Sequence, residues 1–138
     1  MPIAKTIAMY PVDEILEKVG YDAVFEGIVG DTSYVVKVSS LRLRTFQKSR
    51  TCVCCGRVGT VMGLDFPDGQ DRPHFNLYCI EDGEMILMTK DHIIPKSKGG
   101  KNHISNMQTM CCHCNLRKGD KSPEEYRVFL QSRKLIGI

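Results

Sequence analysis

Apolar positions in the first fifty residues predict a helix, a hairpin and a second helix. In residues 11–19 they recur with helical spacing between a proline and a glycine (Val12, Ile15, Leu16 and Val19, between Pro11 and Gly20). Residues 23–29 and 33–39 are typical of two strands joined through a turn at Gly30-Asp31. Residues 40–49 alternate leucine with arginine like a strand, but their length also suits a helix, which we favour.

The remaining pattern predicts one more hairpin and two more helices. Residues 56–73 are rich in Gly, Pro and Asp and are expected to form a loop. Residues 74–80 and 84–90 flank Asp82-Gly83, a pair favoured in tight hairpin turns. A polar loop over 95–106 precedes a short helix over about 112–118. A last helix is expected from Ser122 to about 134, with Pro123 at its first position. These elements indicate an α+β fold.

Seven cysteines are many for 138 residues, and their spacing indicates metal binding. An odd number in two tight clusters does not suit a disulfide framework. Each cluster contains a Cys-x-x-Cys pair, and two such pairs can supply four thiolates to a tetrahedral zinc ion (Cys52 and Cys55, Cys111 and Cys114). The neighbouring Cys54 and Cys112 remain possible substitutes. Cys79 stands alone in a predicted strand and is interpreted as a small buried apolar residue.

The charge of the chain is unevenly distributed. Residues 1–84 carry a net charge of −3 and residues 85–138 a net charge of +6. Residues 37–57 contain six basic residues and no acidic one. Such patches can follow a phosphate backbone, although solvated surface produces the same composition. No apolar run is long enough to span a membrane, and the N-terminus does not read as a secretory signal, so we expect a cytoplasmic protein.

The stretch 88–121, MTKDHIIPKSKGGKNHISNMQTMCCHCNLRKGDK, resembles the HNH endonuclease family in its DH…N…CN form. Asp-His-Ile-x-Pro, a Gly-Gly loop, Asn-x-Gln-x-x-Cys-x-x-Cys-Asn and a basic end occur in the order of the family. The resemblance covers residues 85–121, with Cys52 and Cys55 as the outlying half of the zinc site. It implies a ββα-metal nuclease centre that hydrolyses phosphodiester bonds in DNA.

The resemblance also implies roles for individual residues. His92 matches the general base, and Asp91 and Asn115 match the ligands of one catalytic divalent cation, Mg²⁺ or Mn²⁺. Asn106 matches the middle asparagine, which fastens the loop and orients the base. The products would be 5′-phosphate and 3′-hydroxyl ends. Basic residues around the motif are candidates for phosphate contacts (Lys96, Lys98, Lys101, Arg117, Lys118 and Lys121).

The sequence thus predicts two parts that form one compact unit: residues 1–50, a helix and β region of unknown role, and residues 51–138, a zinc-braced HNH nuclease domain. The resemblance is to phage-type proteins, so host-cell cytoplasm and phage or host DNA-processing partners are expected, and a homodimer would make double-strand cleavage simple. Two alternatives stay open. One is an inactive zinc-stabilised module that binds DNA or protein, and the other is an RNA substrate.

Overall fold

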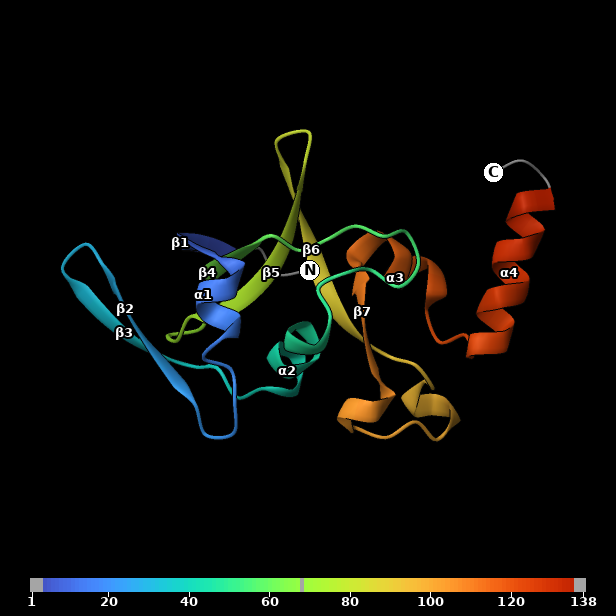
Figure 1. Ribbon diagram of the computed structural model, residues 1–138, viewed down its shortest axis with the longest axis horizontal. Coiled ribbons are helices and arrows are strands. Elements are labelled where there is room, and N and C mark those ends of the chain that lie inside the picture. The colour runs from blue at the N-terminus through green and yellow to red at the C-terminus, as the bar shows by residue number, and fades with distance from the viewer. Residues whose placement is uncertain (1–3, 68, 136–138) are drawn as a thin grey trace.

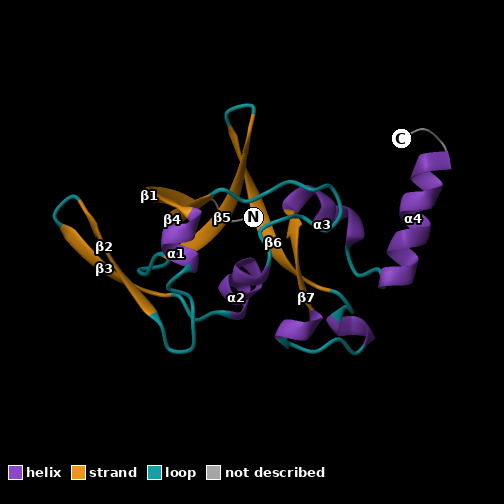
Figure 2. Cartoon of the chain, in the orientation of Figure 1, coloured by secondary structure: helices purple, strands orange, loops and turns teal. Residues whose placement is uncertain are grey.

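The computed structural model describes residues 4–67 and 69–135 as a mixed α/β protein that is mostly sheet (Figures 1 and 2). Five antiparallel strands lie in the order β1-β4-β5-β6-β7, and a separate hairpin contains β2 and β3. The strands are β1 (Ala4–Pro11), β2 (Val24–Val29), β3 (Thr32–Lys37), β4 (Val61–Pro67), β5 (His74–Glu81), β6 (Glu84–His92) and β7 (Met107–Cys111). The helices are α1 (Val12–Leu16), α2 (Leu41–Lys48), α3 (Cys112–Lys118) and α4 (Pro123–Leu135), with 3₁₀ turns η1 (Lys96–Lys98) and η2 (Ile104–Asn106).

Most predicted elements are confirmed. Both predicted hairpins form, and the turn between β5 and β6 has positive φ at Asp82 (51°) and Gly83 (77°), as the Asp-Gly pair indicates. Residues 40–49 form helix α2, whose N-terminus is capped by the Ser40 side chain, which accepts a hydrogen bond from Leu43 N–H. Helices α3 and α4 lie where they are expected. Helix α1 is shorter than expected and ends at Leu16.

The prediction of a loop over 56–73 is wrong for β4. This strand contains Gly63 and Asp65, which resemble turn residues in the sequence, yet Asp65 is completely buried. Its carboxylate accepts hydrogen bonds from Thr6, Asn76 and Tyr78 on the two neighbouring strands. A buried carboxylate is stable where its oxygens are hydrogen-bonded, so the network lets a polar residue occupy an interior strand of the sheet.

Aromatic contacts in the core hold the β2–β3 hairpin against the sheet. Phe25 of β2 packs edge to face with Tyr10 of β1 and Phe75 of β5, at ring-centroid distances of 5.3 and 5.5 Å. Strand β1, which the sequence did not reveal, pairs with β4 at the sheet edge. The division of the chain at residue 50 stays a prediction. In the described residues we find no helix with the length and apolar character that a bilayer crossing needs.

Candidate metal centre and active site

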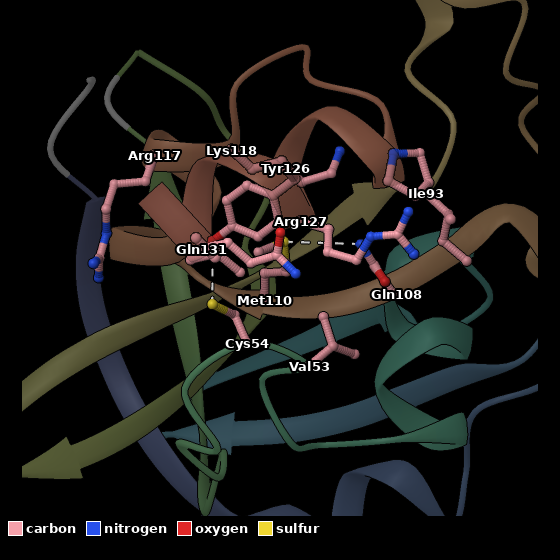
Figure 3. Close-up of a pocket in the computed structure, with 12 residues that line it drawn as sticks. Val53, Cys54, Ile93, Gln108, Met110, Arg117, Lys118, Tyr126, Arg127 and Gln131 are labelled. Atoms are coloured by element: carbon pink, nitrogen blue, oxygen red, sulfur yellow. Dashed lines mark hydrogen bonds between the residues drawn. The ribbon is translucent and has the colours of Figure 1, made fainter. Parts of the chain in front are cut away.

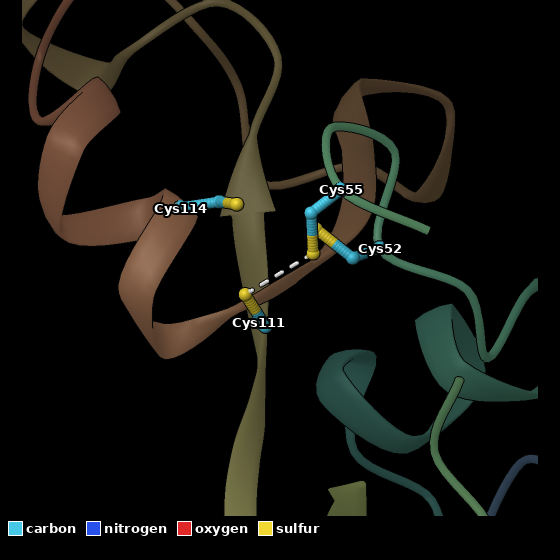
Figure 4. A group of neighbouring side chains, drawn as sticks. All are labelled: Cys52, Cys55, Cys111 and Cys114. Atoms are coloured by element: carbon cyan, nitrogen blue, oxygen red, sulfur yellow. Dashed lines mark hydrogen bonds between the residues drawn. The ribbon is translucent and has the colours of Figure 1, made fainter. Parts of the chain in front are cut away.

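The four cysteines of the two Cys-x-x-Cys pairs lie together (Figure 4). All four sulfur atoms are within 4.8 Å of one another, and Cys55 Sγ lies 3.7 Å from Cys111 Sγ. A tetrahedral zinc ion with Zn–S bonds of about 2.3 Å places its sulfur ligands about 3.8 Å apart. The cluster therefore has the size and donor set that a structural zinc site requires, and three of its four residues are buried.

Local backbone geometry brings these thiols together. Cys52 N–H donates to Arg57 O (2.7 Å), Gly56 N–H donates to Cys52 O (3.1 Å), and the positive φ of Gly56 (82°) closes the turn. Val53 N–H donates to Thr109 O, which docks this turn onto β7. Cys111 ends β7 and Cys114 lies in α3, so the junction between these two elements supplies the second pair.

One cationic side chain, Arg57, lies against the cluster. Burial, followed by hydrogen bonding to Cys111, raises the pKa of the Cys114 thiol. Arg57 Nη1 donates to Cys55 Sγ (3.3 Å) and to Cys111 Sγ (3.6 Å), while its Nη2 lies 3.1 Å from Glu81 Oε2. Hydrogen bonds to Glu81 and then to the two sulfur atoms raise the pKa of Arg57.

The remaining cysteines lie outside the cluster. Cys54 Sγ is 3.1 Å from Tyr126 Oη of α4. Cys79 is a buried residue of β5 that packs in the hydrophobic core, as expected. The grouping of sulfur atoms therefore favours the two Cys-x-x-Cys pairs over Cys54 and Cys112 as metal ligands.

Asp91 lies in β6 opposite Gln108 of β7 and is only 7% exposed. Gln108 Nε2 donates to Asp91 Oδ2 at 2.9 Å. The ammonium of Lys118, at the end of α3, lies 3.2 Å from the same oxygen and also donates to His92 O at 3.0 Å. Two strands and a helix thus fix the Asp91 carboxylate, which faces the junction of β6, β7 and α3.

His92 ends β6, and its imidazole meets the following loop. His92 Nε2 lies 2.7 Å from Asn102 Oδ1, so with the asparagine oriented in this way Nε2 carries the proton and Nδ1 is the basic nitrogen. Asp91 and His92 both line a cavity of about 300 Å³ whose other walls come from η1 and the end of α3. The structure therefore brings this Asp-His pair to one cavity.

Asn106 joins the two ends of the loop that follows His92. Its Oδ1 accepts from Ile94 N–H (2.9 Å), and its Nδ2 donates to Ile94 O (3.1 Å) and Lys101 O (3.0 Å). Between these points the chain turns at two glycines. Gly99 has a positive φ of 89°, and a Cβ on Gly100 would lie 1.6 Å from Ile94 O. The Gly-Gly sequence is therefore a steric requirement of this loop.

Asn115 lies in α3 one turn before Lys118, and its Nδ2 donates to Thr89 Oγ1 at 2.8 Å. Thr89 is two residues before Asp91 on β6, so both side chains project from the same face of that strand. Asn115 does not line the cavity shared by Asp91 and His92. With its NH₂ group bonded to Thr89, the carbonyl oxygen is the atom with which Asn115 could bind a cation.

Among the candidate phosphate contacts, Lys118 is only 2% exposed, and its ammonium points inward to Asp91. Lys96 and Lys101 are exposed, and Lys96 lines the cavity. Lys98 donates to Asp120 O (2.7 Å), and Lys121 donates to Arg117 O (3.1 Å).

The basic stretch 37–57 is largely used within the protein. Arg42 donates to Phe75 O, Arg44 to Tyr21 Oη, Lys48 to Ile104 O, and Arg50 lies 4.0 Å from Asp13. These contacts favour a structural role over a continuous phosphate track.

A larger cavity of about 760 Å³ lies between β7, α3 and α4 (Figure 3). Met110 and Val53 are among its apolar walls, and the Tyr126–Cys54 contact crosses its edge. Neither Asp91 nor His92 lines it, so the candidate chemistry belongs to the smaller cavity.

Sequence reasoning missed three residues that support the site, Thr89, Asn102 and Gln108, and it named Lys118 as a phosphate contact without its pairing to Asp91. Gln108 had a signal, because it is the glutamine of Asn-x-Gln, but its pairing with Asp91 depends on β7, which was not predicted. Asn102 had none beyond being a polar loop residue.

Residues 77–129 match the family model of HNH endonucleases, which confirms the resemblance for the segment that carries the motif and suggests a nuclease. The match spans β6, β7, α3 and the intervening loop, together with most of β5 and the first half of α4. No curated protein and no solved structure matches the chain. The phage-type assignment stays a prediction.

Proposed function

We propose that this protein is a metal-dependent DNA endonuclease in which β6, β7 and α3 form a ββα-metal centre. The observation that supports this most is that Asp91 and His92 line one cavity within the segment that matches the HNH endonucleases. In the proposed reaction a water attacks the scissile phosphate, which leaves 5′-phosphate and 3′-hydroxyl ends.

His92 is the proposed general base. A neutral imidazole can take a proton from water near neutral pH, provided that one ring nitrogen has a free lone pair. The contact between Nε2 and Asn102 supports Nδ1 for this role. Asn102 is thus a proposed positioning residue, and Asn106 supports it by fastening the same loop to Ile94 and Lys101.

Asp91 and Asn115 are the proposed ligands of one divalent cation. A carboxylate and an amide oxygen are hard donors that suit Mg²⁺ or Mn²⁺, and a site with two protein ligands retains positions for water and phosphate oxygens. When bound, such a cation polarises the phosphate and stabilises the departing oxygen. Gln108 and Lys118, which both contact the Asp91 carboxylate, would hold it in its orientation while the cation is bound.

The four-cysteine cluster is the proposed structural zinc site. It joins the turn at 51–58 to β7 and α3, and would therefore fix the helix that carries Asn115 relative to the strand that carries Asp91. A zinc ion with four thiolate ligands has no open coordination position, so this metal would have a structural role and not a catalytic one. Four of the proposed phosphate contacts are exposed, and one of them, Lys96, lines the cavity; the other three are Lys98, Lys101 and Arg117.

The test is cleavage of supercoiled plasmid by the zinc-loaded protein with Mg²⁺ or Mn²⁺. We expect nicked or linear products from wild type. His92→Ala should lower the rate by about 100-fold or more, because it removes the general base, while its zinc content stays unchanged. Absence of cleavage by wild type with either cation would favour the inactive zinc-stabilised module, and equal cleavage of a structured RNA would extend the substrate class.

A further inference from the structure

Lys118 is a buried lysine in the proposed active site. Its side chain is 2% exposed, and its Nζ lies 3.2 Å from Asp91 Oδ2, 3.5 Å from Asp91 Oδ1 and 3.0 Å from His92 O. A lysine is rarely buried so completely unless it is paired, since removing an ammonium from water is energetically unfavourable. Here one ammonium fastens both the side chain of Asp91 and the backbone of His92.

The same ammonium neutralises the cavity lined by Asp91, which is the one proposed cation ligand that reaches it. Two carboxylates and two ammonium groups line the cavity, so its formal charge is zero with a neutral imidazole (Asp91, Asp120, Lys96 and Lys118). Divalent cations usually bind where the protein supplies net negative charge. The side chains that line this cavity supply no net negative charge, whereas a DNA phosphate entering the cavity adds a negative charge and further oxygen ligands.

We propose that Lys118 is a positioning residue that acts as an internal counter-ion to Asp91 and makes binding of the divalent cation depend on DNA. Without DNA, Lys118 holds the carboxylate in place and keeps the cation affinity low. With the scissile phosphate in the cavity, the added negative charge allows Lys118 and the cation to share Asp91. The cation and DNA therefore bind cooperatively. This inference rests on the proposed function of Asp91 as a metal ligand.

Mn²⁺ binding, measured by electron paramagnetic resonance on zinc-loaded protein, tests the proposal without relying on activity. A His92→Ala background keeps the DNA uncut. In this background we expect Mn²⁺ to bind at least about tenfold more tightly with a short duplex than without it, since one added charge a few ångströms from a divalent ion has an effect of that order. Equal affinity with and without the duplex would overturn the proposal.

A second comparison removes the counter-ion. Lys118→Met keeps most of the side-chain volume, and it should raise the DNA-free affinity for Mn²⁺ by about tenfold. Lys118→Arg keeps the charge and should leave that affinity low. Adding Asp91→Asn to Lys118→Met should abolish the gain, which places the new binding at Asp91. A folded, zinc-loaded Lys118→Met protein whose DNA-free affinity equals that of its parent would refute the counter-ion role.

Two results separate this inference from the proposed function. If Lys118→Met does not fold, equal Mn²⁺ affinity with and without the duplex would still overturn the proposal, because that measurement retains Lys118. If wild type cleaves plasmid while Mn²⁺ binding is independent of DNA, the proposed nuclease stands and only the role of Lys118 fails. If wild type never cleaves, the proposed nuclease fails whatever the Mn²⁺ result.

Discussion

Replacing Asn106 with alanine should loosen the loop that positions His92 and leave the rest of the fold in place. Asn106 makes three side-chain hydrogen bonds, with Ile94 N–H, Ile94 O and Lys101 O, at 2.9 to 3.1 Å. A hydrogen bond contributes about 1 kcal/mol net, so the three together contribute about 3 kcal/mol at most. Because Asn106 is only half-buried, water replaces part of this, and about 1.5–3 kcal/mol is a reasonable range.

That free energy corresponds to a change of about 10- to 100-fold in the population of the open loop. Plasmid cleavage should fall by a similar factor. Amide hydrogen exchange on the zinc-loaded protein provides a direct structural check. The Ile94 amide loses its acceptor, Asn106 Oδ1, and should exchange about 10- to 100-fold faster. The Ile93 amide donates to the backbone oxygen of residue 106 and should be affected less.

His103→Ala is the matched control in the same loop. His103 Nδ1 accepts a hydrogen bond from Ser105 N–H at 3.2 Å and caps η2, whereas the side-chain contacts to Ile94 come from Asn106. Its replacement should leave Ile94 exchange close to the wild-type rate. If Ile94 in Asn106→Ala exchanged as slowly as in wild type, or if cleavage were unchanged, the reasoning that this asparagine holds the catalytic loop would be wrong.

Three further changes probe other parts of the structure. Tyr78→Phe removes a donor to the buried Asp65 carboxylate and should lower the free energy of unfolding at neutral pH by about 1.5–3 kcal/mol in urea denaturation. Burial, and then the hydrogen bond to Asp65, raises the pKa of Tyr78 from 10.0 to about 12. The contribution of Tyr78 to the free energy of unfolding is therefore present below pH 10 and is lost as the pH rises toward 12. This alkaline loss of stability should be absent in Tyr78→Phe. Gly100→Ala should reduce plasmid cleavage by about tenfold or more while zinc content stays unchanged, because the added Cβ forces the loop that follows His92 to move. Arg57→Ala should speed zinc loss to a chelator by about tenfold, since the Arg57 guanidinium donates to two cluster sulfurs. The control Arg50→Ala breaks an exposed ion pair with Asp13 and should leave the rate of zinc loss unchanged. Equal rates for the two variants would exclude a role of Arg57 in holding the metal.

The sequence was most informative where local chemistry determines structure. Asp82-Gly83 predicted its turn because both residues take positive φ, which few other pairs tolerate. The Cys-x-x-Cys pairs predicted a cluster because their spacing alone directs two sulfurs to one point, and the structure places all four together. Pro123 and the acidic residues after it likewise located the start of α4.

The sequence was least informative where a residue depends on partners far along the chain. Asp65 resembled a loop residue because its donors, on β1 and β5, are 11 to 59 positions away. Lys118 was named only as a candidate phosphate contact because its partner Asp91 is 27 positions away. Asn102 could not be recognised, since its contact with His92 follows from the path of the Gly-Gly loop. In each case tertiary pairing overrides local composition.

Plasmid cleavage by zinc-loaded wild type and His92→Ala, compared under the same Mg²⁺ and Mn²⁺ conditions, tests the proposed nuclease most directly. We predict that wild type converts supercoiled plasmid to nicked or linear DNA with 5′-phosphate ends. His92→Ala, with equal zinc and an equal melting temperature, should not. Cleavage at the wild-type rate by His92→Ala would contradict the proposed general base, and intact plasmid with folded, zinc-loaded wild type would contradict the proposed nuclease itself.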